Sequence, residues 1–158
     1  MTITSPMLGV DISATPSAND SGIALGTRVL ATDGQEYLYV LAGSAITQYD
    51  CVGVDEKYTA NPLTKAIADD GWIIGFAQVA FASGDYGWVA TKGSNINSRV
   101  AGSCAADVTL YTTATAGVLD DTSTSQTNID GVVCVASNGT TATASVEVIA
   151  TWPRSTTF

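Results

Sequence analysis

Short segments with an apolar side chain at every second position follow one another along this chain, and turn residues separate them. In the clearest example, residues 145–152, one face carries Val146, Val148, Ala150 and Trp152. A repeat of two residues is the period of a half-buried β-strand. Turn signals recur about every 8–12 residues, a spacing typical of sandwiches and barrels. The pattern predicts an all-β fold, a small β-barrel or sandwich of about nine to ten short strands.

Residues 28–41 carry the strongest hairpin signal. Asp33-Gly34 separates two apolar runs, and this dipeptide supplies the positive φ angles of a two-residue type I′ turn. In the second strand Tyr37 and Tyr39 share one face, and Leu38 lies on the other. We therefore expect a tight hairpin whose second strand is apolar on both faces.

Further segments are expected from the same signals. The run 72–82 is apolar on both faces and predicts a central, doubly covered strand. Residues 61–68 fit either a short helix with Pro62 at its first position or a loop. Other strands are expected at 46–54, 88–93, 96–100, 108–113 and 132–136.

The charge of the chain argues against two classes of partner. Of 158 residues, 13% are charged, the net charge is −9, and the six basic residues are scattered through the sequence. An acidic chain without a basic cluster repels phosphate backbones and anionic lipid. We expect no nucleic-acid partner and no membrane partner.

The nucleophiles and bases of the chain do not form a recognisable catalytic or metal motif. Histidine is absent, which removes the commonest general base and the commonest zinc ligand. Cys51, Cys104 and Cys134 match no CxxC or zinc-knuckle spacing, and we expect unpaired, buried thiols, which suit a reducing cytoplasm. No catalytic residue, cofactor or metal is predicted.

Two pairs of adjacent aspartates keep alternatives open. Asp69-Asp70 and Asp120-Asp121 could supply a glycosidase pair or bind calcium. Neighbouring residues on a strand point to opposite faces, and the spacing is unlike an EF-hand loop, so turns are the preferred interpretation. The tryptophans and tyrosines are expected mainly in the core, with a sugar-binding groove as the alternative.

The first 22 residues form a segment of different character, rich in Ser, Thr and Pro, with isolated apolar residues and no regular period. The start of the chain has no basic and apolar run of the secretory type. We expect an extended arm over residues 1–22 that contacts a neighbouring molecule, followed by one β domain over 23–158; an edge strand docked on its own sheet is the alternative. The expected partner-binding residues lie in this arm and near the C-terminus: Ile3, Met7, Leu8, Val10, Ile12, Trp152 and Phe158.

From about residue 24 to residue 135 the chain resembles the capsid decoration, or cement, proteins of tailed bacteriophages. The resemblance rests on segments such as Glu36-Tyr-Leu-Tyr39, Asp70-Gly-Trp-Ile-Ile-Gly-Phe-Ala77 and Gly84-Asp-Tyr-Gly-Trp-Val89, in that order. It implies a small β-barrel without enzymatic activity, made in the host cytoplasm. Such a protein binds the major capsid protein on the outside of the virion and cements neighbouring capsomers. A homotrimer on the capsid is expected.

Two other functions remain open from the sequence. A head-fibre base or a tail component would use the same kind of low-charge β domain. A carbohydrate-binding β-sandwich would use the aromatic residues.

Overall fold

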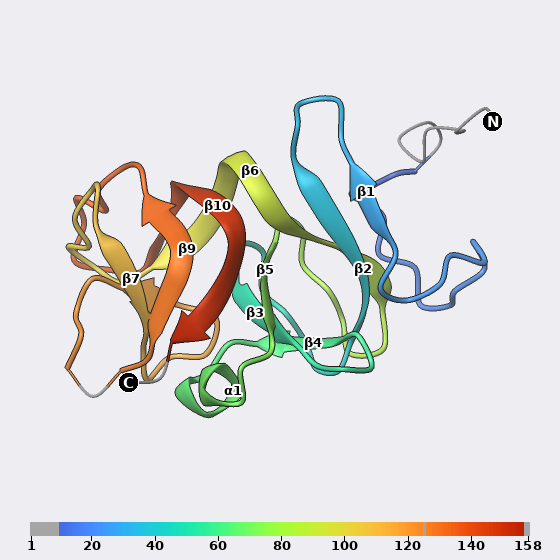
Figure 1. The fold of residues 1–158 in the computed structure, drawn as a ribbon, viewed down its shortest axis with the longest axis horizontal. Helices are drawn as coiled ribbons and strands as arrows, with labels where there is room; N and C mark the ends of the chain where they lie inside the picture. Colours follow the sequence, from blue (N-terminus) through green and yellow to red (C-terminus); the bar gives the residue numbers. More distant parts are fainter. Residues whose placement is uncertain (1–9, 125, 157–158) are drawn as a thin grey trace.

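The computed structural model describes residues 10–124 and 126–156, and their regular structure is almost entirely β (Figure 1). The all-β class predicted from the sequence is thereby confirmed. The elements are β1 (Arg28–Leu30), β2 (Glu36–Ala42), β3 (Cys51–Val54), β4 (Thr59–Pro62), α1 (Lys65–Asp69), β5 (Ile73–Ala77), β6 (Tyr86–Val100), β7 (Thr109–Thr112), β8 (Leu119–Asp120), β9 (Asn128–Cys134) and β10 (Ala144–Thr156).

The long strand β6 belongs to two closed rings of strands. The first ring runs β2-β4-β3-β5-β6 and closes because β6 pairs again with β2. The second runs β6-β10-β9-β7-β8 and closes where Val100 of β6 pairs with Leu119 of β8. In Figure 1, β6 lies between β7, β9 and β10 on one side and β2, β3 and β4 on the other. Each ring contains five strands, and because β6 belongs to both, nine strands of the described chain form the two rings.

Each ring encloses its own apolar interior. All five strands of the first ring contribute to one buried cluster, which includes Leu38, Val52, Ala60, Ala77 and Val89. All five strands of the second ring contribute to another, which includes Ile96, Leu110, Leu119, Ile129 and Val148. Burial of such side chains contributes about 1.5–3 kcal/mol each. The interiors explain why most strands are apolar at alternate positions.

The second cluster continues over the outer face of the first ring. Tyr37 and Tyr39 belong to it, whereas Leu38 between them points into the first ring. The predicted division of this strand between two faces is confirmed. Tyr39 packs against Trp88, with ring centroids 4.8 Å apart, and residues of the N-terminal segment partly cover both.

The hairpin of β1 and β2 is present, with Val29 opposite Tyr37, but its turn differs from the prediction. Gly34 has φ +85°, and Asp33 is not among the residues with positive φ. The Gly34 N–H donates to the Ala31 carbonyl at 3.0 Å, so the loop is a longer turn that ends in a single left-handed glycine. The two-residue type I′ turn was therefore wrong, since that turn needs positive φ at both central positions.

Two expected strands are shorter than predicted. Of residues 46–54, only Cys51–Val54 form β3, because the Asp50 carboxylate accepts a hydrogen bond from the Thr47 N–H at 2.9 Å and holds a turn. Residues 72–82 form β5 only as far as Ala77. Hydrogen-bonded side chains compete here with the strand ladder.

The helix α1 begins later than Pro62, the position expected for its first turn. Pro62 instead ends β4 and pairs with Val52. Thr64 is the N-cap, and its hydroxyl accepts a hydrogen bond from the Ile67 N–H at 3.3 Å.

Strand β10 departs from its predicted alternation at Trp152. Val146, Val148 and Ala150 are buried as expected. Beyond Ala150, three residues of β10, Thr151–Pro153, lie opposite the single residue Gly131 of β9. Trp152 has φ +50° in this bulge and is 52% exposed instead of sharing the buried face. Bulges commonly redirect a side chain in this way.

Candidate partner-binding site around Trp152

The structure separates the seven residues expected to bind a partner into three groups. Val10 and Ile12 are half-buried and pack against the core of their own domain. The same segment is tied to β6, where the Tyr86 N–H donates to the Pro16 carbonyl at 2.8 Å. Trp152 is exposed. The remaining residues, Ile3, Met7, Leu8 and Phe158, lie outside the described residues. Contact of the arm with a neighbouring subunit stays a prediction.

Trp152 is held by Glu36 of β2. The indole Nε1–H donates to Glu36 Oε1 at 2.9 Å, and Arg28 Nη1 and the Thr91 hydroxyl donate to the same oxygen at 2.5 and 3.2 Å. Burial raises the pKa of Glu36, but the hydrogen bonds from Trp152 and Arg28 outweigh it, so its pKa lies below the ordinary value. The carboxylate is therefore ionised at neutral pH and fixes the orientation of the indole.

A cation covers part of the Trp152 ring. Lys92 Nζ lies 4.2 Å from the ring centroid, within the range of a cation–π interaction. Such a contact contributes about 0.5–1 kcal/mol at an exposed site. Since half of the residue is still exposed, Trp152 is a large aromatic surface that is fixed in place before any partner arrives.

A hollow of about 210 Å³ lies beside this ring. Trp72 forms another wall, and Arg28 and Arg154 also line the hollow. We call Trp152, Trp72, Arg28, Lys92 and Arg154 the Trp152 site. Rigid aromatic and arginine side chains of this kind are enriched among residues that dominate binding energy at protein interfaces.

The sequence did not indicate this gathering of charge. Three of the six basic residues of the chain, Arg28, Lys92 and Arg154, surround Trp152, although they are scattered along the sequence. The expectation that no basic cluster exists is thus wrong for the folded chain. Apolar and aromatic area next to cations, on a chain of net charge −9, suits a partner segment that offers apolar side chains together with carboxylates.

A second exposed apolar surface lies on the outside of β9 and β10. Val133 and Ile149 are paired across the two strands and are each 45% exposed. Val135 continues the row at 37%. We call these three residues the β9–β10 strip. It contains no aromatic side chain and no cation.

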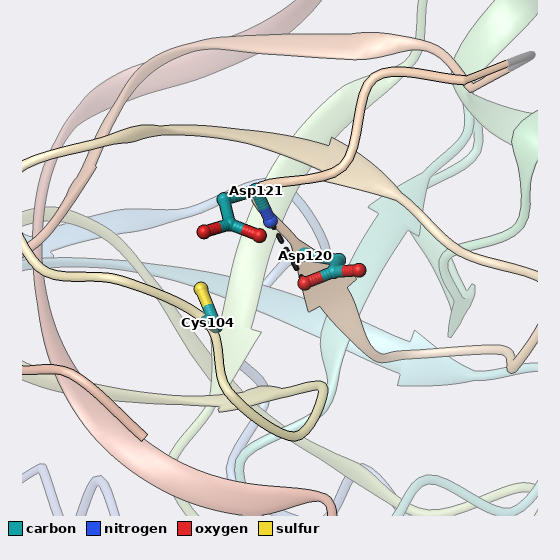
Figure 2. A group of neighbouring side chains, drawn as sticks. All are labelled: Cys104, Asp120 and Asp121. Carbon is teal, nitrogen blue, oxygen red and sulfur yellow. Dashed lines mark hydrogen bonds between the residues drawn. The ribbon is translucent and has the colours of Figure 1, made fainter. Parts of the chain in front are cut away.

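The two aspartate pairs considered for catalysis or calcium lie in different surroundings. Lys65 donates to Asp69 at 2.8 Å, and the Thr127 hydroxyl also donates to Asp69. The hydrogen bond from Lys65, followed by that from Thr127, lowers the pKa of Asp69. Asp120 and Asp121 lie beside Cys104 in the second ring (Figure 2). Neither pair faces the hollow at Trp152.

The cysteines agree with the prediction made from their spacing. Cys51, Cys104 and Cys134 are free and buried. Burial, followed by the charge of Asp50, raises the pKa of the Cys51 thiol far above its ordinary value. A buried thiol with a raised pKa is a poor nucleophile at neutral pH.

Comparison with known proteins adds no relative. The chain matches no protein-family model, and no curated protein or solved structure is similar to it. Within the described residues, no helical segment has the length and apolarity that a bilayer crossing requires. The assignment of a function therefore depends on the sequence and on the geometry above.

Proposed function

We propose that this chain is a structural virion protein that binds the outer surface of a tailed-phage capsid and cements neighbouring capsomers. The observation that carries the proposal is Trp152, an exposed aromatic side chain held rigidly by Glu36 and Lys92. A preorganised anchor loses little conformational freedom when it binds, so more of its contact energy appears as affinity. The resemblance to decoration proteins, in segments of β2, β5 and β6, supports the nature of the partner.

The chemistry of the chain supports a binding role over a catalytic one. The sequence has no histidine, and several carboxylates already serve structural contacts. Asp50 pairs with Arg99 at 2.5 Å, and Asp55 accepts hydrogen bonds from the Lys57 and Thr59 N–H groups at 2.9 and 2.8 Å. These groups stabilise turns and ring junctions.

The proposal includes a homotrimer as the oligomeric state of the chain on the capsid. Capsomers meet at local symmetry axes, and a homotrimer of this chain would present three Trp152 sites to the surrounding major capsid protein. Linked sites of moderate affinity bind tightly because the second and third contacts form at high effective concentration. The chain then needs only a modest interface on each copy.

The test uses particles of the phage that encodes the chain. Particles that lack the gene should bind recombinant protein in hundreds of copies on the outer shell, as measured by quantitative mass spectrometry and electron cryomicroscopy. The Trp152→Ala variant should bind at least tenfold more weakly. Ile149→Ala is the matched control, since Ile149 of the β9–β10 strip is similarly exposed but lies outside the Trp152 site.

The outcomes separate the alternatives. About a dozen copies or fewer at one vertex or on the tail would contradict decoration and support a head-fibre base or tail role. Normal binding by Trp152→Ala with loss of binding by Ile149→Ala would move the interface to the β9–β10 strip and refute the anchor.

A carbohydrate-binding module is the second candidate, because Trp72 and Trp152 both line the hollow at the Trp152 site. Aromatic rings beside arginines can hold a sugar ring. Saturable binding in a glycan screen that Trp72→Ala and Trp152→Ala both abolish, together with no attachment to particles, would favour this function over decoration.

A further inference from the structure

A cysteine and two aspartates converge in the second ring, away from the Trp152 site. Cys104 lies in the loop after β6, Asp120 ends β8, and Asp121 follows it. The Cys104 sulfur and one oxygen of each carboxylate all lie within 4.8 Å of one another. Figure 2 shows the sulfur pointing toward the two carboxylates. The three side chains thus bring together the two ligand types that a borderline metal ion accepts.

Backbone groups fix both carboxylates in this arrangement. Asp121 Oδ2 accepts a hydrogen bond from the Ala105 N–H at 2.9 Å, and Asp120 Oδ1 accepts one from the Asp121 N–H at 2.9 Å. Each carboxylate keeps its other oxygen without a hydrogen bond to the described part of the chain. The Ala101 N–H donates to the Leu119 carbonyl at 2.8 Å and so holds the loop of Cys104 beside β8. Such outer contacts orient metal ligands in established sites.

A second free thiol lies in the same ring. Cys134 of β9 is fully buried, and its Sγ donates to the Ala136 carbonyl at 3.2 Å. The convergent ligand atoms are those of Cys104, Asp120 and Asp121, which come from two separate segments of the chain.

Metal binding by a cysteine uses the thiolate form of the side chain, and a coordinated metal ion stabilises the deprotonated sulfur directly.

We propose that Cys104, Asp120 and Asp121 bind Zn²⁺ or a similar thiophilic divalent cation. Binding replaces the Cys104 thiol proton, which passes to the buffer, by a sulfur–metal bond; the carboxylates bind as anions. Calcium and magnesium are disfavoured because they take oxygen ligands and not thiolates. Ligand bonds to zinc are about 2.0–2.3 Å long, so the three side chains must move closer together when the ion binds.

The test is titration of the full chain with Co²⁺, a spectroscopic substitute for zinc, in the presence of a non-chelating reductant. We expect one equivalent to bind, with visible d–d bands, a thiolate-to-cobalt charge-transfer band, and displacement of both by Zn²⁺. Cys51→Ala is the matched control, because Cys51 is also buried and free but lies outside this cluster. It should keep the bands, and Cys104→Ala should lose the charge-transfer band.

Two conservative variants keep the test independent of folding defects in the core. Asp120→Asn and Asp121→Asn retain an oxygen for the backbone contacts, so both should fold, yet each should bind Co²⁺ at least tenfold more weakly. Zinc should raise the melting temperature of the wild type and of Cys51→Ala, and not that of Asp121→Asn. Absence of saturable one-to-one binding would overturn the proposal. A charge-transfer band that survives in Cys104→Ala, or unchanged affinity in both asparagine variants, would also overturn it.

Discussion

Replacement of Gly117 by alanine should be one of the most damaging single-methyl additions to this chain. Gly117 has φ +76°, and a Cβ built there would lie 2.4 Å from Asp50 Cγ and 2.5 Å from Asp50 Oδ1. Ordinary contacts to a Cβ begin at 3.4 Å, so the Asp50 carboxylate must move by about 1 Å. That carboxylate is buried, and it pairs with Arg99 at 2.5 Å while it accepts the Thr47 N–H at 2.9 Å.

The expected loss of stability has two parts. The left-handed backbone costs a residue with a side chain about 1–2 kcal/mol. Disruption of a buried ion pair costs about 3–5 kcal/mol, and the lower end applies because the Arg99 side chain is 26% exposed and can regain water. Together, Gly117→Ala should lower the free energy of unfolding by about 4–5 kcal/mol. For a domain stable by about 5–15 kcal/mol, that is a large fraction.

Denaturant unfolding followed by tryptophan fluorescence measures this loss, and two controls isolate its cause. Gly71→Ala has nearly the same backbone angle, φ +74°, but no atom lies within 4 Å of the added methyl, so it should cost only about 1 kcal/mol. In an Asp50→Gly background, Gly117→Ala should also cost little more than the backbone term, since the Asp50 carboxylate and the Asp50 Cβ, which lies 2.8 Å from the added methyl, are both absent. Equal losses for Gly117→Ala and Gly71→Ala would refute the reasoning.

Three other contacts give measurable expectations. Because the pKa of Glu36 is lowered, its contribution to stability is present above the ordinary value of 4.5 and is lost as the pH falls below it. The indole N–H resonance of Trp152 should therefore shift over that pH range in the wild type and not in Glu36→Gln. A resonance in the wild type that does not change with pH would contradict this expectation. The three buried thiols should resist a disulfide reagent in the native state at mildly alkaline pH and all react in guanidinium; fast native reaction would refute their burial. The buried Asn138 amide donates at 2.8 Å to the carbonyls of both Ala101 and Ala142, so Asn138→Asp should destabilise the fold by about 3 kcal/mol, and an unchanged unfolding midpoint would contradict it.

The two-residue period of apolar side chains predicted the strands well, but it did not predict which strands pair to close the rings. The alternation of Tyr37, Leu38 and Tyr39 between two faces could be read from the sequence, because it depends on the two-residue period alone. Closure of the second ring depends on the pairing of Val100 with Leu119, two residues in segments whose own periodicity contains no information on their partner. Lengths of strands were overestimated where a side chain such as Asp50 replaced the ladder with a turn.

The Trp152 site shows the same limit at the level of function. The sequence placed Trp152 both among the partner-binding residues and on the buried face of its strand. The bulge opposite Gly131 turns its side chain to the exposed surface. Its anchor, Glu36, is 116 residues away in the sequence, so no spacing rule connects them. The cluster around Cys104 was missed for the same reason, since Asp120 and Asp121 are distant from it along the chain and adjacent only in the fold.

The sharing of β6 by two rings also determines how the protein responds to force and to solvent. Release of β6 breaks hydrogen bonds in both rings, because β6 pairs with β2 and β5 in the first ring and with β10 and β8 in the second. Amide hydrogens of residues 86–100 should therefore be among the slowest to exchange with deuterium. A force applied at Trp152 passes from β10 to β6 and from β6 to the first ring. It loads the hydrogen bonds between these antiparallel strands in shear, so that many of them must break at the same time. Such an arrangement gives the domain mechanical resistance to a pull of this kind.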